Sequence, residues 1–196
     1  MKNETQNPEI EAVETPETEP QTVETAPVHN PADWVTENFS WREMTRSQTA
    51  ARRGIDNTPN AEQRKNILYT AQQLEKIRAY VAQKFGAPRV VMVSSGFRSL
   101  TLNRAIGGST TSAHVHGLAA DFDIQGLTSA QTAKIVKEMK DKGLIDYDQL
   151  ILEYPTRGDG AWVHIGFKAG GKGHRRQELT ANRVNGKTVY SAGLQA

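Results

Sequence analysis

The most regular hydrophobic pattern in the chain predicts a long amphipathic helix that begins after Asn60. Apolar residues recur in it at steps of three and four positions, as the buried face of a helix requires. The pattern stops at Gly86 and Pro88, two residue types that end helices. Its simplest interpretation is a face packed against a core, formed by Ile67, Ala71, Leu74, Ile77, Val81 and Phe85 and widened by Leu68.

Shorter patterns predict the other elements of a folded domain. Ser40 with Glu43, and Thr128 with Gln131, are typical of helix starts, and the second of these helices runs to about Lys142. This succession of elements favours an α+β domain whose small, mainly antiparallel sheet carries helices on one face. Strands are predicted at 89–93, 118–124, 148–153 and 162–167, the last two as a hairpin with a long loop, and a further helix at 99–106.

Charge divides the 196 residues into three parts. Residues 1–33 hold one lysine against eight acidic residues and few large apolar ones, so they predict a disordered tail rich in Glu, Thr and Pro. A folded domain is expected over 34–170, and 171–196 is interpreted as a basic C-terminal extension. The absence of cysteine excludes disulfides, thiolate zinc fingers and cysteine nucleophiles.

Basic residues outnumber acidic ones 23 to 14 beyond the tail, which indicates an anionic partner such as a cell-wall polymer, a nucleic acid or a membrane surface. No stripe of aromatic residues interleaved with Lys and Arg supports the nucleic-acid hypothesis. No apolar run approaches the roughly 18 residues that span a membrane, and residues 1–4 lack the start of a secretory signal. We therefore expect cytoplasmic synthesis, no nucleic-acid partner and no membrane insertion.

One short segment concentrates the candidate chemistry. In Ser112-Ala-His114-Val-His-Gly-Leu-Ala-Ala-Asp121 a histidine precedes an aspartate by seven residues, and His164 follows forty-three residues later. Two imidazoles and one carboxylate are the protein ligands of a catalytic zinc site, which keeps its fourth position for water. The alternative is that these histidines are surface residues or hydrogen-bonded core residues. The combination favours a zinc site, and with it a hydrolase.

The same residues carry a family resemblance. The segments Ser95-Gly96-Phe97-Arg98-Ser99 and Ser112-x-His114-x-x-Gly117-x-Ala119-x-Asp121, followed by Trp162-Val163-His164, resemble the signature of zinc peptidases that act on peptidoglycan peptides. That family includes D-alanyl-D-alanine carboxypeptidases and phage endolysins of the L-alanyl-D-glutamate peptidase type. The resemblance covers roughly residues 39–167. It implies a fold shared with the hedgehog signalling domain, with zinc ligands at His114, Asp121 and His164.

The resemblance also implies an acidic general base that takes a proton from the water activated by zinc. The family usually has this residue three positions before the last histidine, where this chain has Ala161. Glu153 is the preferred candidate, because antiparallel pairing of the two last strands turns it to the side of His164. Asp159 is the second candidate, although its position between two glycines is typical of a turn. The alternative for Glu153 is a strand-end carboxylate that faces solvent.

Two further residues receive roles from the resemblance. Arg98 is expected to face the substrate, where a permanently charged guanidinium binds a developing oxyanion or a peptide carboxylate. The alternative for Arg98 is a structural salt bridge. Ser112 is expected to hydrogen-bond the substrate or the metal loop. His116 is expected to be exposed or to support the ligands. Tyr154 and Trp162 are expected to line the cleft, and a core position is the alternative for Trp162.

The function implied by the resemblance is zinc-dependent hydrolysis of peptide bonds in the stem peptide of bacterial peptidoglycan. A phage endolysin released through a holin, or a wall hydrolase carried in a virion, fits a chain without a secretory signal. An endopeptidase is preferred over a D-Ala-D-Ala carboxypeptidase. Ala161 keeps another alternative open, namely a non-catalytic module that retains the metal and binds the wall or forms part of a virion.

Overall fold

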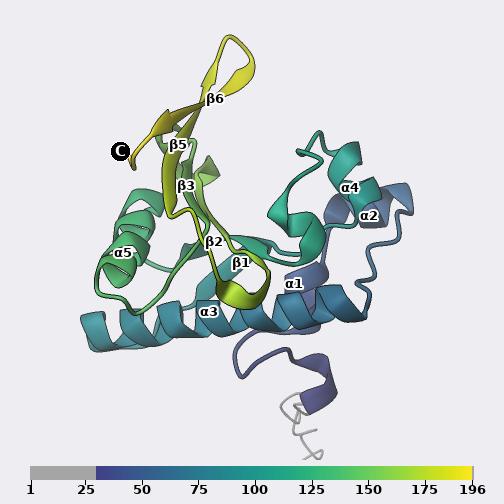
Figure 1. The fold of residues 1–196 in the computed structure, drawn as a ribbon, viewed down its shortest axis with the longest axis horizontal. Helices are drawn as coiled ribbons and strands as arrows, with labels where there is room; N and C mark the ends of the chain where they lie inside the picture. Colours follow the sequence, from purple (N-terminus) through teal and green to yellow (C-terminus); the bar gives the residue numbers. More distant parts are fainter. Residues whose placement is uncertain (1–29, 196) are drawn as a thin grey trace, which may run out of the picture.

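One six-stranded sheet organises residues 30–195, the part of the chain that the computed structural model describes (Figure 1). Its strands lie in the order β1-β2-β4-β3-β5-β6, and neighbouring strands are antiparallel except β3 and β5, which run parallel. The predicted α+β class is confirmed. The strands are β1 (Val91–Ser95), β2 (Ala119–Ile124), β3 (Gln149–Glu153), β4 (Trp162–Gly166), β5 (Gln177–Val184) and β6 (Lys187–Ala192).

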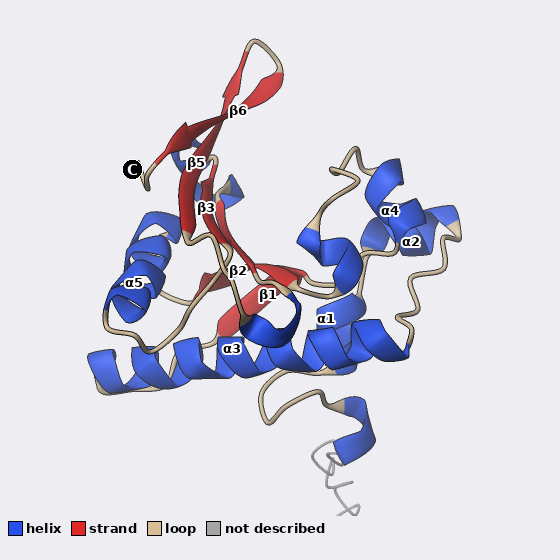
Figure 2. Ribbon diagram, viewed as in Figure 1, coloured by secondary structure: helices blue, strands red, loops and turns tan. Residues whose placement is uncertain are grey.

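The helices begin where the capping residues indicate. Asn60 with Gln63, and Thr128 with Gln131, form complete capping boxes at the starts of the two longest helices. Figure 2 shows the longest of them running beneath the sheet. The α-helices are α1 (Trp41–Thr45), α2 (Gln48–Arg53), α3 (Ala61–Phe85), α4 (Leu100–Ala105) and α5 (Ser129–Asp141), and the 3-10 helices are η1 (Pro31–Asp33), η2 (Ala113–His116), η3 (Pro155–Gly160) and η4 (Ala169–Gly171).

The apolar stripe of α3 forms the centre of the core. Five of its residues are fully buried and belong to one cluster with α5 and the sheet, namely Ile67, Ala71, Leu74, Ile77 and Val81. Two members of the predicted stripe differ, because Leu68 stays 39% and Phe85 40% exposed. Phe85 is the last residue of α3. The guanidinium of Arg89 lies 4.4 Å from its ring centre, so the ring packs against this cation and not against the core. Leu68 lies at the margin of the stripe.

Alternation along the strands gives the sheet two different faces. One face packs on α3 and α5 and is apolar, with Ala120, Phe122, Ile124, Leu150, Leu152, Val163 and Ile165 buried in the core. The intervening positions point to the opposite face and include Asp121, Glu153 and His164. The candidate residues of β2, β3 and β4 therefore share the face that the core leaves open.

Residues 171–196, which the charge pattern separates as a basic extension, supply β5 and β6 to the same sheet. β5 adds to β3 in parallel, with Leu179 opposite Ile151. The chain returns as β6 after Asn185 and Gly186, whose φ angles of 50° and 78° are typical of a type I′ turn. This hairpin, drawn in yellow in Figure 1, projects beyond the other strands. The division of the chain into domains stays a prediction.

Most of the acidic tail predicted over residues 1–33 lies outside the described residues, and residues 31–33 form η1. Within residues 30–195, no helix combines the length and the apolar character needed to cross a bilayer.

Candidate metal centre

Two strands and one helical turn bring the candidate ligands together. His114 lies in η2, and Asp121 and His164 are direct partners on the antiparallel strands β2 and β4. Gly117, with φ of 73°, ends η2 and lets the chain turn back into β2. As a result, one nitrogen of each imidazole and one carboxylate oxygen all lie within 4.8 Å of one another.

The spacing of the three ligand atoms suits a single small cation. His114 Nε2 lies 3.1 Å from Asp121 Oδ1 and 3.2 Å from His164 Nδ1, and the third side of the triangle is 2.8 Å. Ligands bound tetrahedrally to zinc at about 2.0–2.1 Å are separated from one another by about 3.3 Å. Both the size of the triangle and its nitrogen and oxygen donors therefore fit the predicted zinc cofactor.

The loop after β1 fixes the orientation of His114. This imidazole is 1% exposed, and its Nδ1 lies 2.6 Å from the carbonyl oxygen of Gly96. Because a carbonyl only accepts hydrogen bonds, Nδ1 carries the proton and the lone pair of Nε2 faces Asp121 and His164. Position 96 requires glycine, since a Cβ there would overlap the carbonyl oxygen of Met44. The backbone thereby selects the tautomer that can bind a metal.

Burial and charge set the protonation of the same three residues. Burial lowers the pKa of the His114 imidazole and so favours its neutral form. Burial alone would raise the pKa of Asp121, but the adjacent His114 and His164 hold that pKa well below its usual range. A neutral imidazole beside an ionised carboxylate is the state that binds a divalent cation.

A cavity of about 1010 Å³ opens onto the three ligands. Pockets for small molecules usually measure about 300–1,000 Å³, so this cavity has room for a peptide. The loop between α4 and η2 lines one side of it, and strands β3 to β6 line the other. Arg98, Ser112 and Glu153 contribute to its walls.

Arg98 lines this cavity and also contacts one of the candidate ligands. Its Nη2 lies 3.6 Å from Asp121 Oδ2, and its backbone N–H donates to the carbonyl of His114 at 3.2 Å. Burial lowers the pKa of the guanidinium, whereas the negative charges of Asp121 and Glu153 oppose that change. Its Nε is buried and has no hydrogen-bond partner among the described residues. Arg98 thus forms the salt bridge that was the alternative to a substrate-facing role, and its Nε is still a free donor among the described residues.

Ser112 precedes η2 at the wall of the cavity. Its hydroxyl does not cap that helix, and within residues 30–195 it makes no hydrogen bond. The hydroxyl therefore remains available to a molecule in the cavity.

The structure places the two candidate bases in different cavities. Glu153 opposes Trp162 and lies diagonally from His164 on the same face, a separation of about 7–8 Å between Cβ atoms. It is 8% exposed and lines the cavity of the ligands, and burial raises its pKa to about 7. Asp159 is exposed in η3 and lines a separate cavity of about 560 Å³. Glu153 is thus the carboxylate near the ligands, and it does not face solvent.

The remaining expectations concern the surroundings of the ligands. His116 is exposed, and only its carbonyl is used, as the acceptor for Asn66 at 2.9 Å. Tyr154 and Trp162 both line the cavity, and their ring centres lie 5.2 Å apart.

Sequence reasoning missed the part of the cavity wall that β5 and β6 form. Leu179, Arg183, Thr188 and Tyr190 line the cavity from these strands. The signal that could have found them is Asn185-Gly186 between two β-branched and polar runs, which is a strong sequence pattern for a hairpin.

A buried His–Asp–His group with an open side, next to a buried carboxylate and a guanidinium, is typical of single-metal hydrolases. The chain belongs to the peptidase M15 family, whose model matches residues 37–153. It is also 33% identical over 85 residues to the zinc D-Ala-D-Ala carboxypeptidase of Streptomyces albus G. That match covers 43% of this chain and 31% of the relative, so the chain spans about a third of the curated protein that it resembles.

The family match includes His114, Asp121 and Glu153, but it ends before His164. The pairing of β2 with β4 brings His164, the third candidate ligand, to the site. The roles of the individual residues stay predictions.

Proposed function

We propose that the protein is a zinc-dependent peptidase that hydrolyses peptide bonds in the stem peptide of bacterial peptidoglycan. The observation that carries the proposal is the arrangement of His114, Asp121 and His164 at the floor of a peptide-sized cavity, with Glu153 on the same face of the sheet. Membership of the peptidase M15 family supports the reaction class, and the name of the Streptomyces relative supports the substrate.

The chain's own residues divide the chemistry between them. A zinc ion bound by the three ligands would lower the pKa of a water molecule and polarise the scissile carbonyl. Glu153 takes the proton from the attacking water at its carboxylate and passes it to the leaving amine. A pKa of about 7 suits both transfers, because a general base works best when its pKa lies near the working pH.

Arg98 acts on the other side of the reacting carbonyl. Its guanidinium lies beside Asp121 and has a buried Nε without a partner among the described residues. We assign to it the stabilisation of the negative charge that develops on the carbonyl oxygen, and to Ser112 a hydrogen bond to the substrate.

Digestion of purified peptidoglycan tests the proposal. The protein is incubated with the polymer, with and without a chelator, and the new peptide ends are identified by mass spectrometry. We expect chelator-sensitive release of peptides and its loss in Glu153→Gln, with Asp159→Asn as the matched control that keeps activity. Wild-type protein loaded with zinc that releases nothing would refute the proposal and favour the non-catalytic module that Ala161 keeps open.

The same spectra decide the finer alternatives. We favour an endopeptidase over a carboxypeptidase, because residues on both sides of the ligands along the strands line the cavity, from Gln149 to Thr188. Internal cleavage supports that choice, and release of terminal D-alanine alone contradicts it. A phage endolysin or a virion-associated hydrolase remains part of the proposal, supported by the sequence reasoning alone.

A further inference from the structure

The β5–β6 hairpin extends the face of the sheet that carries the ligands. Glu153 is paired with Ala181 of β5, and Ala181 is paired with Tyr190 of β6. Because directly paired residues point to the same side, Tyr190 lies on the face of Glu153, two strands away. Arg183 and its partner Thr188 lie on that face one step further along the hairpin. The family match ends at residue 153, so this wall lies outside it.

Arg183 differs from the other basic residues of the cavity. Arg98 lies 3.6 Å from Asp121, and Lys168 and Arg175 both pair with Asp148. Arg183 lines the cavity and is exposed, and its side chain makes no salt bridge or hydrogen bond to the residues that the structure describes. It therefore presents an unneutralised guanidinium to whatever occupies the cavity.

Contacts of Tyr154, the residue before η3, connect the hairpin to β4 next to the candidate ligands. The hydroxyl groups of Tyr154 and Thr188 lie 2.7 Å apart, and the Tyr154 ring also contacts Trp162 beside His164. Tyr154 has a φ of 52°, a left-handed conformation that is strained for a residue with a side chain. Such strain is concentrated at functional sites, and here it places one ring between β4 and the hairpin.

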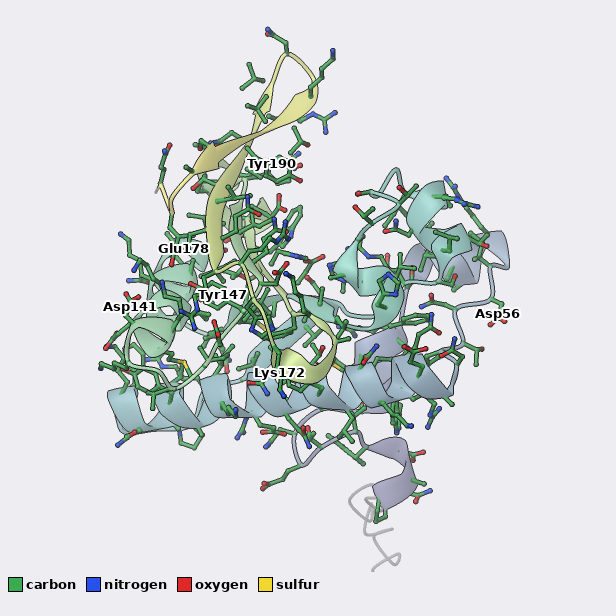
Figure 3. The ribbon with its side chains drawn as sticks, viewed as in Figure 1. Asp56, Asp141, Tyr147, Lys172, Glu178 and Tyr190 are labelled. Carbon is green, nitrogen blue, oxygen red and sulfur yellow. The ribbon has the colours of Figure 1, made fainter. Side chains whose placement is uncertain are left out.

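Tyr190 and Leu179 provide an apolar surface on the face of the hairpin that carries Arg183. Tyr190 is 54% exposed although it lines the cavity, which leaves its ring open to a ligand. Burial and then the negative charge of Glu153 raise the pKa of Tyr190, so its hydroxyl stays neutral. Figure 3 shows Tyr190 on the projecting hairpin, whereas Glu178, from the other face of β5, bonds Lys140 of α5.

We propose that this hairpin binds substrate and that Arg183 pairs with a free carboxylate of the substrate peptide, whose carbon chain lies on Tyr190 and Leu179. The inference rests on the proposed peptidase function and adds a binding group to it. A planar guanidinium suits this role, because its fork matches the two oxygens of a carboxylate. Stem peptides offer such a group at the α-carboxylate of γ-linked D-glutamate and at the C-terminus.

Three synthetic stem peptides test the assignment. One carries both carboxylates, one is amidated at the D-glutamate α-carboxylate, and one is amidated at the C-terminus. Their dissociation constants are measured by calorimetry with zinc-loaded Glu153→Gln, alone and combined with Arg183→Met, Arg183→Lys or Lys187→Met. Lys187 is the matched control, because it is an exposed cation of the same hairpin that does not line the cavity. kcat and KM are measured with the same changes in the wild-type background.

A charge-assisted pair of this kind changes affinity by about 10- to 100-fold. We expect Arg183→Met to weaken binding of the free peptide by about that factor and to raise KM with little change in kcat. Its affinity for the peptide amidated at the recognised carboxylate should equal that of the parent. Arg183→Lys should retain part of the affinity, and Lys187→Met should retain all of it. Whichever amidated peptide loses affinity for the parent protein identifies the carboxylate that Arg183 binds.

The outcomes separate this inference from the function on which it rests. If wild-type protein cleaves the free peptide and Arg183→Met binds all three peptides as its parent does, the hairpin assignment is wrong and the peptidase proposal stands. An equal loss for all three peptides would also overturn it, because that result indicates a structural role. If Glu153→Gln does not bind the free peptide and the wild-type protein does not cleave it, both proposals fail.

Discussion

Replacing Glu153 by glutamine should abolish activity and, above neutral pH, stabilise the fold. Burial holds the pKa of Glu153 near 7, against an ordinary value of 4.5. Between these two values the folded protein binds more protons than the unfolded chain. The contribution of Glu153 to the free energy of unfolding is therefore fully present below pH 4.5 and is lost as the pH rises through 7. One pKa unit corresponds to about 1.36 kcal/mol, so the ionised carboxylate costs the fold about 3 kcal/mol above pH 7. Glutamine has the same shape without the charge and removes that cost.

Thermal unfolding followed by circular dichroism measures this effect in chelator-treated protein. A free-energy change of 1 kcal/mol shifts the melting temperature of a domain of this size by about 2–4 °C. Glu153→Gln should therefore melt about 6–12 °C above wild type at pH 8 and at the same temperature at pH 4.5. Glu37→Gln, at an exposed glutamate, is the control and should change neither value.

Two further measurements complete this prediction. With zinc present the gain at pH 8 should shrink, because a nearby cation stabilises the ionised carboxylate. Peptide hydrolysis should fall by about 10²- to 10⁴-fold, the usual contribution of a general base. A lower melting temperature at pH 8, or an equal gain at both pH values, would refute the reasoning.

Four other changes follow from contacts described above or present elsewhere in the fold. Zinc at about 100 times its dissociation constant should stabilise the wild-type protein by about 2.7 kcal/mol in melting experiments, and a zinc-independent melting temperature is expected for His114→Ala. Gly96→Ala should weaken zinc binding by about 10- to 100-fold in a chelator competition, because the new Cβ overlaps the Met44 carbonyl and displaces the acceptor of the ligand's Nδ1 proton. Glu75→Ala should cost about 1–3 kcal/mol in urea unfolding, since its carboxylate accepts three hydrogen bonds from the segment before α1; an unchanged midpoint would contradict this. Asp159→Asn should keep full activity on peptidoglycan, because Asp159 lines the other cavity, and a loss would make it the stronger candidate for the base.

Local patterns were enough to predict much of the fold. The three- and four-residue period of α3, the capping box at Thr128 and the alternation of β2 are all encoded within one element. The parallel pairing of β5 with β3 is different, because it joins strands more than twenty residues apart in an order that no local pattern specifies. The charge pattern separated that region only as a basic extension, and it did not indicate that Arg175 and Arg176 pair with Asp148 and Asp146.

The candidate site shows the same division. The residue types and order of His114, Asp121 and His164 indicated a common site, and the structure brings them together. The hydrogen bond that orients His114 could not be predicted. Its Nδ1 donates to a backbone carbonyl, and every residue type has a backbone carbonyl, so the sequence does not mark the acceptor. The contribution of Arg183 to the cavity likewise depends on the non-local pairing of β5.

The direct opposition of Asp121 and His164 couples cofactor uptake to the alignment of two strands. If the register of β4 against β2 shifted by one residue, His164 would point into the apolar core and Val163 would take its place on the open face of the sheet. Such a chain would keep Asp121 as its one ligand from the strands and could no longer hold the ion between β2 and β4. Zinc binding during folding therefore stabilises only the molecules in which β2 and β4 have the correct register. A chain with a shifted register would not bind the ion and would remain susceptible to proteolysis.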